Sequence, residues 1–238
     1  MCELFGFSAR KKFNINNVLK AFFSRSEYHP HGWGLVMYGD NGCPTFIKEP
    51  IAANMSNYLP IVLEKPVKID LAIAHIRYAT KGKKSISNTH PFVSRIKNDD
   101  WFLAHNGTIE IPNSKKENID STDSELILQA ISKELILTNC INPINHIETI
   151  ISKLSVYGKM NLLFTNGQQL FVFSNRTQGI YSLTLDGCVL FSTKPITLNT
   201  DTNWFPVAIN KLIVFEKGRE IYRTKEVLIN ESIERMII

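Results

Sequence analysis

The second residue of the chain is a cysteine, and this position determines the chemistry that it can do. Removal of Met1 would leave Cys2 with a thiol and a free α-amine on one residue. The ordinary pKa values of these groups are about 8.5 and about 7.7–8.0, so a proton can pass between them with little adjustment. Cys2 can therefore act as a nucleophile with its own general base. The alternative is that Cys2 opens a buried strand, because free cysteine often packs as a small hydrophobic residue.

Attack by Cys2 on an amide would need a site for the oxyanion, and the segment His105-Asn106-Gly107 supplies a candidate. The Asn106 side-chain amide and the Gly107 backbone N–H are donors of the kind that stabilise an oxyanion. Asn-Gly alone is more typical of a simple turn. Asn106-Gly107 is a candidate oxyanion site because it directly follows an apolar strand.

An amino-acid substrate would also need charged residues that bind its carboxylate and its ammonium group. Arg77 ends an apolar strand and can hold a carboxylate with two parallel hydrogen bonds, although a surface ion pair explains it equally well in isolation. Asp123 can bind an ammonium group, or it can simply interact favourably with the dipole of the helix that begins there. Thr80 and His90 can complete the pocket near Arg77, although an isolated histidine is more often structural.

Hydrophobic periodicity indicates which elements carry these residues. The segment 122–125 has the Thr-x-x-Glu pattern of a capping box and predicts a helix start. Helices are expected at 16–24, 55–63, 122–136 and 143–156, and strands at 2–8, 32–38, 45–48, 70–78, 101–105, 161–165, 169–174, 180–184, 189–192, 211–216 and 220–222. Strands at both ends with helices between them favour an α+β fold in which antiparallel sheets are covered by helices.

Composition narrows the class of protein further. The 238 residues, 44% hydrophobic and 21% charged, predict one soluble domain over residues 1–238 with no membrane span. Four scattered cysteines argue against a zinc site or a disulfide framework and favour a reducing cytoplasm. The net charge of +5 is modest, and the basic run 81–84 lacks interleaved aromatic residues. We therefore expect no nucleic-acid partner, no metal and no organic cofactor.

Taken in order, the motifs resemble the class II glutamine amidotransferase (glutaminase) domain, and they are most similar to stand-alone bacterial proteins that begin Met-Cys-Glu-Leu-x-Gly. The resemblance covers most of the chain. It implies the N-terminal-nucleophile hydrolase fold, a four-layer αββα sandwich with two antiparallel sheets. The matching segments are 1–6, 31–34, 74–77, 88–92, 104–107, 122–125 and 192–195.

The resemblance also implies a role for each candidate residue. Cys2 would attack the γ-carboxamide, and Asn106 and Gly107 would form the oxyanion hole. Arg77 would bind the α-carboxylate and Asp123 the α-ammonium of the substrate. The remaining residues of the expected substrate pocket are Thr80, His90 and His105.

Two functions from different classes remain open at the level of sequence. The first is hydrolysis or transfer of the γ-amide of glutamine, or of another small γ-glutamyl compound, through a Cys2 γ-glutamyl thioester. The second is a non-catalytic γ-glutamyl-binding or regulatory subunit, which retention of Met1 would favour. Because the glutaminase-like domain is expected to occupy nearly the whole chain, any ammonia acceptor would be a separate synthase or acceptor subunit.

Overall fold

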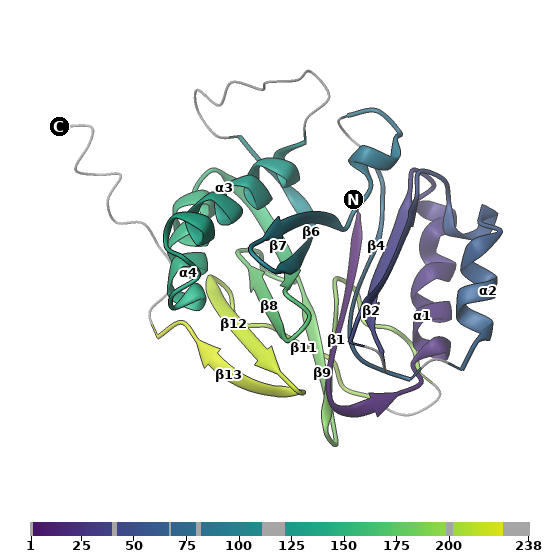
Figure 1. Ribbon diagram of the computed structural model, residues 1–238. Coiled ribbons are helices and arrows are strands. Elements are labelled where there is room, and N and C mark those ends of the chain that lie inside the picture. The colour runs from purple at the N-terminus through teal and green to yellow at the C-terminus, as the bar shows by residue number, and fades with distance from the viewer. Residues whose placement is uncertain are drawn as a thin grey trace.

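The computed structural model describes residues 2–39, 42–66, 68–79, 82–110, 122–198 and 202–225. Two β-sheets lie face to face, and helices cover the outer face of each sheet (Figure 1). Helices α1 (Asn16–Phe23) and α2 (Tyr58–Glu64) cover one sheet, and α3 (Asp123–Leu137) and α4 (Pro143–Ser155) cover the other. This arrangement confirms the predicted αββα sandwich.

The first sheet has seven strands in the order β11-β9-β10-β1-β4-β2-β3. Its central strand β1 pairs antiparallel with β4 on one side and with β10 on the other. The strands of this sheet are β1 (Glu3–Phe13), β2 (Trp33–Tyr38), β3 (Pro44–Glu49), β4 (Ile69–Ile76), β9 (Tyr181–Leu185), β10 (Cys188–Ser192) and β11 (Phe205–Pro206). The start of β1, and with it Cys2, therefore lies between the ends of β4 and β10.

The second sheet has six strands in the order β13-β12-β8-β7-β6-β5, all paired antiparallel. These strands are β5 (Phe92–Ile96), β6 (Asp99–Ile109), β7 (Gly158–Thr165), β8 (Gln169–Ser174), β12 (Lys211–Glu216) and β13 (Arg219–Arg223). Three short 3₁₀ helices also occur in the described ranges, at Ser24–Tyr28, Ala53–Met55 and Ile86–Asn88.

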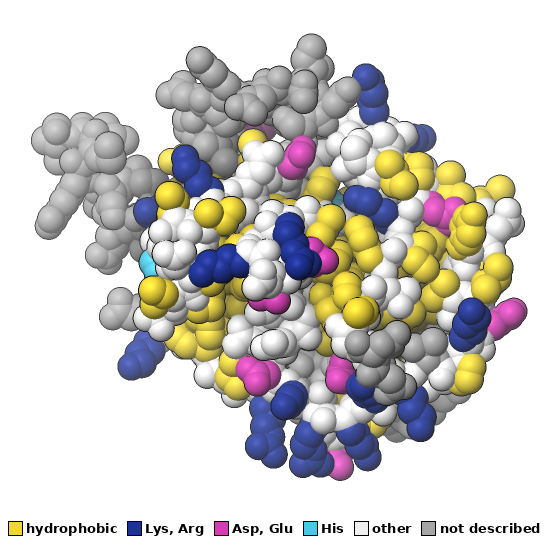
Figure 2. Space-filling model, viewed as in Figure 1, with side chains coloured by type: hydrophobic (Ala, Val, Ile, Leu, Met, Phe, Trp, Pro, Cys, Tyr) yellow, Lys and Arg dark blue, Asp and Glu magenta, His cyan; other side chains and the backbone are white. Residues whose placement is uncertain are grey.

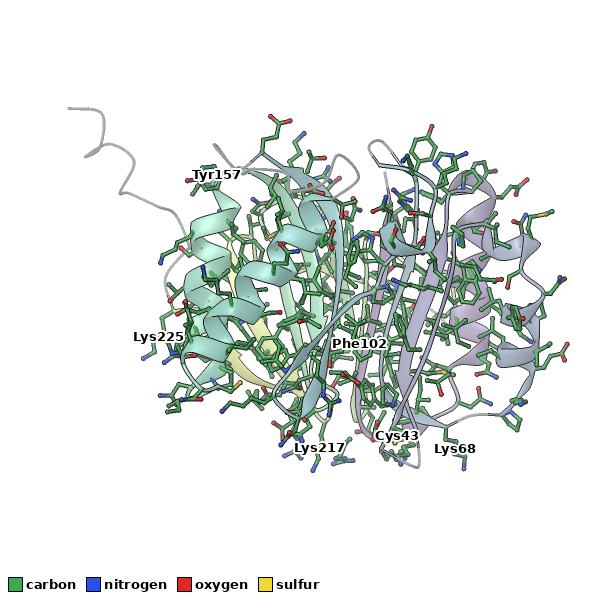
Figure 3. All side chains as sticks on the ribbon, turned by 45° about the horizontal axis from the view of Figure 1, so that its top comes forward. Cys43, Lys68, Phe102, Tyr157, Lys217 and Lys225 are labelled. Atoms are coloured by element: carbon green, nitrogen blue, oxygen red, sulfur yellow. The ribbon has the colours of Figure 1, made fainter. Side chains whose placement is uncertain are left out.

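Apolar side chains fill three layers of this sandwich. Phe5 and Phe22 pack between the first sheet and its helices, and Ile127 packs between the second sheet and α3. The middle layer between the two sheets includes Leu4 and Phe102 (Figure 3). Because the first half of β1 is covered on both faces, Leu4 and Phe5 are both apolar and buried although they point to opposite faces.

The structure departs from the sequence prediction mainly in the lengths of strands. β1 continues to Phe13, and β6 runs from Asp99 to Ile109 instead of covering only 101–105. The edge strand β5 lies between the strands expected at 70–78 and 101–105, where no strand was expected. The helix expected at 55–63 begins only at Tyr58, after a 3₁₀ turn. The errors in the strands share one cause, since cross-strand pairing extends strands into polar sequence.

Candidate active site

Cys2 lies at the meeting point of three strands. Glu3 pairs with Ile76 at the end of β4, and the backbone N–H of Thr193, just after β10, donates to Leu4 O at 3.2 Å. The Cys2 Sγ accepts the backbone N–H of Tyr78 at 3.3 Å. The segment that follows β4 therefore forms one wall around the thiol.

The environment of Cys2 acts on its pKa in two directions. Burial raises the pKa of the thiol, whereas the Tyr78 N–H and the charge of Arg77 lower it, and burial has the larger effect. The net shift is upward. At neutral pH the thiol is thus largely protonated, and attack on a carbonyl requires a base that takes up this proton.

Asn106 reaches Cys2 from the second sheet. Its side-chain amide Nδ2 donates to the Cys2 carbonyl oxygen at 2.6 Å, and the Asn106 side chain is 5% exposed. Side chains alternate along β6, so Asn106 faces the first sheet whereas His105 faces α3. A Cβ atom at the next residue, Gly107, would lie 1.8 Å from the Lys159 carbonyl oxygen. Glycine there allows β6 and β7 to approach closely beside Asn106.

Arg77 directly follows β4 and is held by its backbone. Its N–H donates to Gly32 O at 2.7 Å, and its carbonyl accepts from His31 N at 3.1 Å. The guanidinium Nη1 donates to Lys83 O at 2.9 Å. The residue is 3% exposed, and burial lowers its pKa. A Cβ atom at Gly82 would lie 3.5 Å from Arg77 Nη2, so the loop beginning at Gly82 closes over the guanidinium.

Asp123 is the first residue of α3, and its carboxylate joins this helix to β6. Oδ2 accepts the backbone N–H of Ile109 at 2.9 Å, and Oδ1 accepts that of Ser124 at 3.0 Å. Thr122 caps the helix through Oγ1, which accepts from Glu125 N at 3.4 Å. A Cβ atom at Gly82 would also lie 3.6 Å from Thr122 Cγ2. The start of α3 therefore adjoins the loop that covers Arg77.

Three buried histidines surround this region. The rings of His75 and His90 pack with centroids 4.2 Å apart and their planes tilted by 57°, and within the described structure their nitrogens have no hydrogen-bond partner. Burial, reinforced by the charge of Arg77, lowers the pKa of His75 to about 3. Burial, followed by the charge of His75, also lowers the pKa of His90. The His105 Nδ1 lies 3.0 Å from Ser124 Oγ, and burial likewise lowers the pKa of His105. All three are neutral rings packed inside the protein.

The structure thus brings several of the candidate residues together. Cys2 and Asn106 are hydrogen-bonded, and Arg77 immediately precedes the residue whose N–H contacts the thiol. Asp123, on α3, binds the backbone N–H of Ile109, three residues beyond Asn106 on β6. The rings of His90 and His105 are buried, against His75 and Ser124 respectively. Thr80 lies outside the described residues.

Comparison with known proteins identifies the family to which the chain belongs. Residues 1–186 match the family model described as "Glutamine amidotransferases class-II". The chain belongs to the class II glutamine amidotransferases. The predicted family is therefore confirmed.

Individual relatives of this amidotransferase agree with the family model. The chain is 31% identical to "Uncharacterized protein MJ1515" of Methanocaldococcus jannaschii, over 94% of this chain and 72% of that protein. It is 28% identical to "Putative glutamine amidotransferase YafJ" of Escherichia coli, over 73% of this chain and 72% of that protein. The glutamine phosphoribosylpyrophosphate amidotransferase of B. subtilis shares the fold with a TM-score of 0.70 at 18% identity. That match covers 97% of this chain and 50% of the B. subtilis chain.

Two features of this family member concern ions and membranes. Within the parts of the chain that the structure describes, no three His, Cys, Asp or Glu side chains converge as metal ligands would. Among the helices that are described, none combines the length and the apolar character needed to cross a membrane. On the face shown in Figure 2, Lys and Arg side chains gather at the lower edge with Asp and Glu between them.

Sequence reasoning missed the ion pairs formed by the residue that follows Cys2. Glu3 is 2% exposed and contacts Lys194 Nζ at 2.8 Å and Arg25 Nη1 at 3.0 Å. Burial alone would raise the pKa of Glu3, but hydrogen bonds from Lys194 and Arg25 lower it below its ordinary value. The signal that could have revealed this cluster is a lone acidic residue in an otherwise apolar strand.

A cavity of about 350 Å³ opens beside Cys2. Its walls come from both sheets and from the turn that follows β8. Its lining residues include Cys2, Asn106, Asn161, Arg176, Tyr181 and Lys194.

Proposed function

We propose that this protein cleaves the γ-amide of glutamine, or of another small γ-glutamyl compound, through a thioester on Cys2. The observation that carries the proposal is the contact between the two sheets at one residue. The Cys2 thiol accepts the Tyr78 N–H, while the Asn106 amide reaches the same residue at 2.6 Å. A nucleophile and a hydrogen-bond donor from opposite sheets thus adjoin one cavity.

The first half of the reaction needs a proton acceptor and an oxyanion site. After removal of Met1, the free amine of Cys2 takes the thiol proton, and sulfur forms a bond to the γ-carbonyl carbon. The oxyanion accepts hydrogen bonds from Asn106 Nδ2 and the Gly107 N–H. A carboxamide has two N–H donors, so Asn106 can keep its bond to the Cys2 carbonyl. The C–N bond then breaks, and the leaving amine takes the proton from the Cys2 ammonium.

The second half regenerates the enzyme. Water, deprotonated by the same Cys2 amine, attacks the thioester carbon, and the C–S bond breaks. Glutamate leaves and the sulfur is reprotonated. An amine in place of water would give transfer instead of hydrolysis, and ammonia released in the first half could pass to a separate acceptor protein.

Arg77 and Asp123 would orient the glutamyl group. A buried guanidinium can bind the α-carboxylate with two hydrogen bonds, and Asp123 can bind the α-ammonium. Thr80 is expected to support the carboxylate site. We infer that His90 and His105 act as positioning residues, because their rings pack against His75 and Ser124.

The variant Cys2→Ala tests this function directly. The assay measures ammonia from glutamine, and amine from a panel of γ-glutamyl compounds, with purified protein alone. Mass spectrometry first verifies that the chain begins at residue 2. We expect release to fall to the uncatalysed rate in Cys2→Ala and to persist in Cys43→Ala, which alters an exposed cysteine. Persistent release from Cys2→Ala would overturn the proposal.

A further inference from the structure

The cavity beside Cys2 lies on the side of this residue that faces Lys194. In the order β10-β1-β4, Arg77 follows β4 and Lys194 follows β10, so they flank Cys2 from opposite sides. The cavity is lined by Lys194 but not by Arg77 or Asp123. If the glutamyl group is held toward Arg77, as the proposed function requires, the other side of the scissile bond points into this cavity.

Asn106 and Asn161 line the cavity and belong to a row of three polar side chains on the second sheet. Asn106 pairs with Asn161, which pairs with Ser174, across β6, β7 and β8. The Ser174 hydroxyl donates to Asn161 Oδ1 at 2.7 Å. One step deeper on the same face, the corresponding residues Ala104, Leu163 and Val172 belong to the apolar layer between the sheets. On this face of the second sheet, polar groups therefore take the place of apolar ones where the sheet adjoins the cavity beside Cys2.

The turn after β8 brings a cation to this row. The Gly179 N–H donates to Arg176 O at 3.1 Å, closing the turn. A Cβ atom at Gly179 would lie 2.1 Å from Ser174 Oγ and 2.2 Å from Asn161 Oδ1. Glycine thus allows the turn to rest directly on the polar row, and Arg176 lines the cavity from it.

The charges around the cavity favour an anion. Lys194 and Arg176 line it, and the acidic side chain there is Glu3. Glu3 already contacts both Lys194 and Arg25, so its charge is balanced within the protein. Among the side chains that line the cavity, Arg176, Lys194 and Glu3 sum to one positive charge in excess. The cavity volume of about 350 Å³ falls within the range of about 300–1,000 Å³ typical of small-molecule sites.

From this geometry we propose that the cavity is a subsite for the leaving amine, and that it selects amines that carry a carboxylate. This inference rests on the proposed function and narrows its substrate class. The preferred substrates are γ-glutamyl amino acids and short peptides rather than glutamine. Arg176 and Lys194 bind the carboxylate, while Asn161 and Tyr181 line the cavity around the amine.

Two substrates that differ only in charge test the subsite. γ-Glutamylglycine leaves glycine, and γ-glutamylglycinamide leaves the neutral carboxamide of the same shape. For the wild-type protein, verified to begin at residue 2, we expect kcat/KM to be roughly tenfold or more higher for the carboxylate substrate. We expect Arg176→Met and Lys194→Met each to lower this ratio several-fold. Arg219→Met is the matched control and should keep the wild-type ratio. It lies near Lys217, at the edge of the molecule away from the N-terminus (Figures 1 and 3).

The possible outcomes separate the subsite proposal from the proposed function. Equal kcat/KM for the two substrates in the wild type would overturn the subsite while leaving the proposed function intact. A preference that survives in both Arg176→Met and Lys194→Met would overturn its assignment to this cavity. If Lys194→Met fails to fold because Glu3 loses a partner, Arg176→Met alone decides. If the wild type cleaves neither substrate nor glutamine, the proposed function itself is wrong, and the subsite with it.

Discussion

The residues around Cys2 act on the pKa of its thiol and donate hydrogen bonds to its sulfur and to its carbonyl oxygen. Burial raises the pKa of the thiol, which makes a base necessary, and the α-amine is the base that the chain can provide without another side chain. The Asn106 amide already touches Cys2, so the expected oxyanion donor requires little rearrangement. Preorganised donors of this kind stabilise charge at the moment when it develops.

Replacement of Asn106 by alanine removes one of the two proposed oxyanion donors. We expect kcat to fall by about 10²–10³-fold with a smaller change in KM, as for other enzymes that lose one such donor. Asn54→Ala, which alters an exposed asparagine, should match the wild type. Steady-state kinetics on one γ-glutamyl substrate measures both variants. A change in KM alone would show that Asn106 binds the ground state and not the oxyanion.

At the scale of elements, the site depends on the close approach of strands. β1 brings Cys2 between β4 and β10, and β6 carries Asn106 to it from the opposite sheet. α3 is tied to β6 by the Asp123 carboxylate, which accepts the Ile109 N–H. Glycines at contact points allow this geometry, and Gly107 is the clearest example because the Lys159 carbonyl occupies the place of a side chain.

The variant Gly107→Ala tests this dependence. Because the added Cβ atom would meet Lys159 O at 1.8 Å, β6 and β7 must separate. We expect a loss of about 1–3 kcal/mol in the free energy of unfolding, together with a loss of activity as Asn106 shifts. Thr108→Ala is the control, since it alters the neighbouring residue of β6, whose side chain is exposed. Denaturant unfolding followed by activity measurement compares the two. Equal stability of Gly107→Ala and the wild type would contradict the described packing.

The sequence allowed prediction of the fold and of the residues that meet at Cys2, for a physical reason. Apolar runs followed by a polar residue are visible in sequence, as at Arg77 and Asn106. Three features depend on pairing or contacts that form only in the folded chain and were not visible. These are the edge strand β5, the ion pair between Glu3 and Lys194, and the cavity. The opposite orientations of His105 and Asn106 likewise follow only once strand register is known.

At the scale of the whole molecule, buried neutral histidines link stability to pH. In the folded protein burial lowers the pKa values of His75, His90 and His105, that of His75 to about 3. In the unfolded chain they titrate near an ordinary value of about 6.5. Below that pH the unfolded state binds more protons than the folded state, so stability falls as the pH decreases.

We therefore expect the free energy of unfolding to decrease between about pH 6.5 and about pH 5, by about 1.4 kcal/mol per pH unit for each histidine at the limiting slope. This window lies above the ordinary pKa values of carboxylates, which limits their contribution. Denaturant titrations at pH 7.5, 6.5, 5.5 and 5.0 measure the slope. Constant stability across this range would show that the three rings are accessible to protons in the folded state.

The most direct test of the account is the mass of the protein itself during turnover. Protein whose chain begins at Cys2 is mixed with a γ-glutamyl substrate, and the reaction is quenched in acid. The N-terminal peptide of the protein is then analysed by mass spectrometry. The account predicts one added glutamyl group on that peptide in the wild type, and none in Cys2→Ala. Turnover by protein that still carries Met1, or steady turnover with no glutamyl group ever found on Cys2, would contradict it.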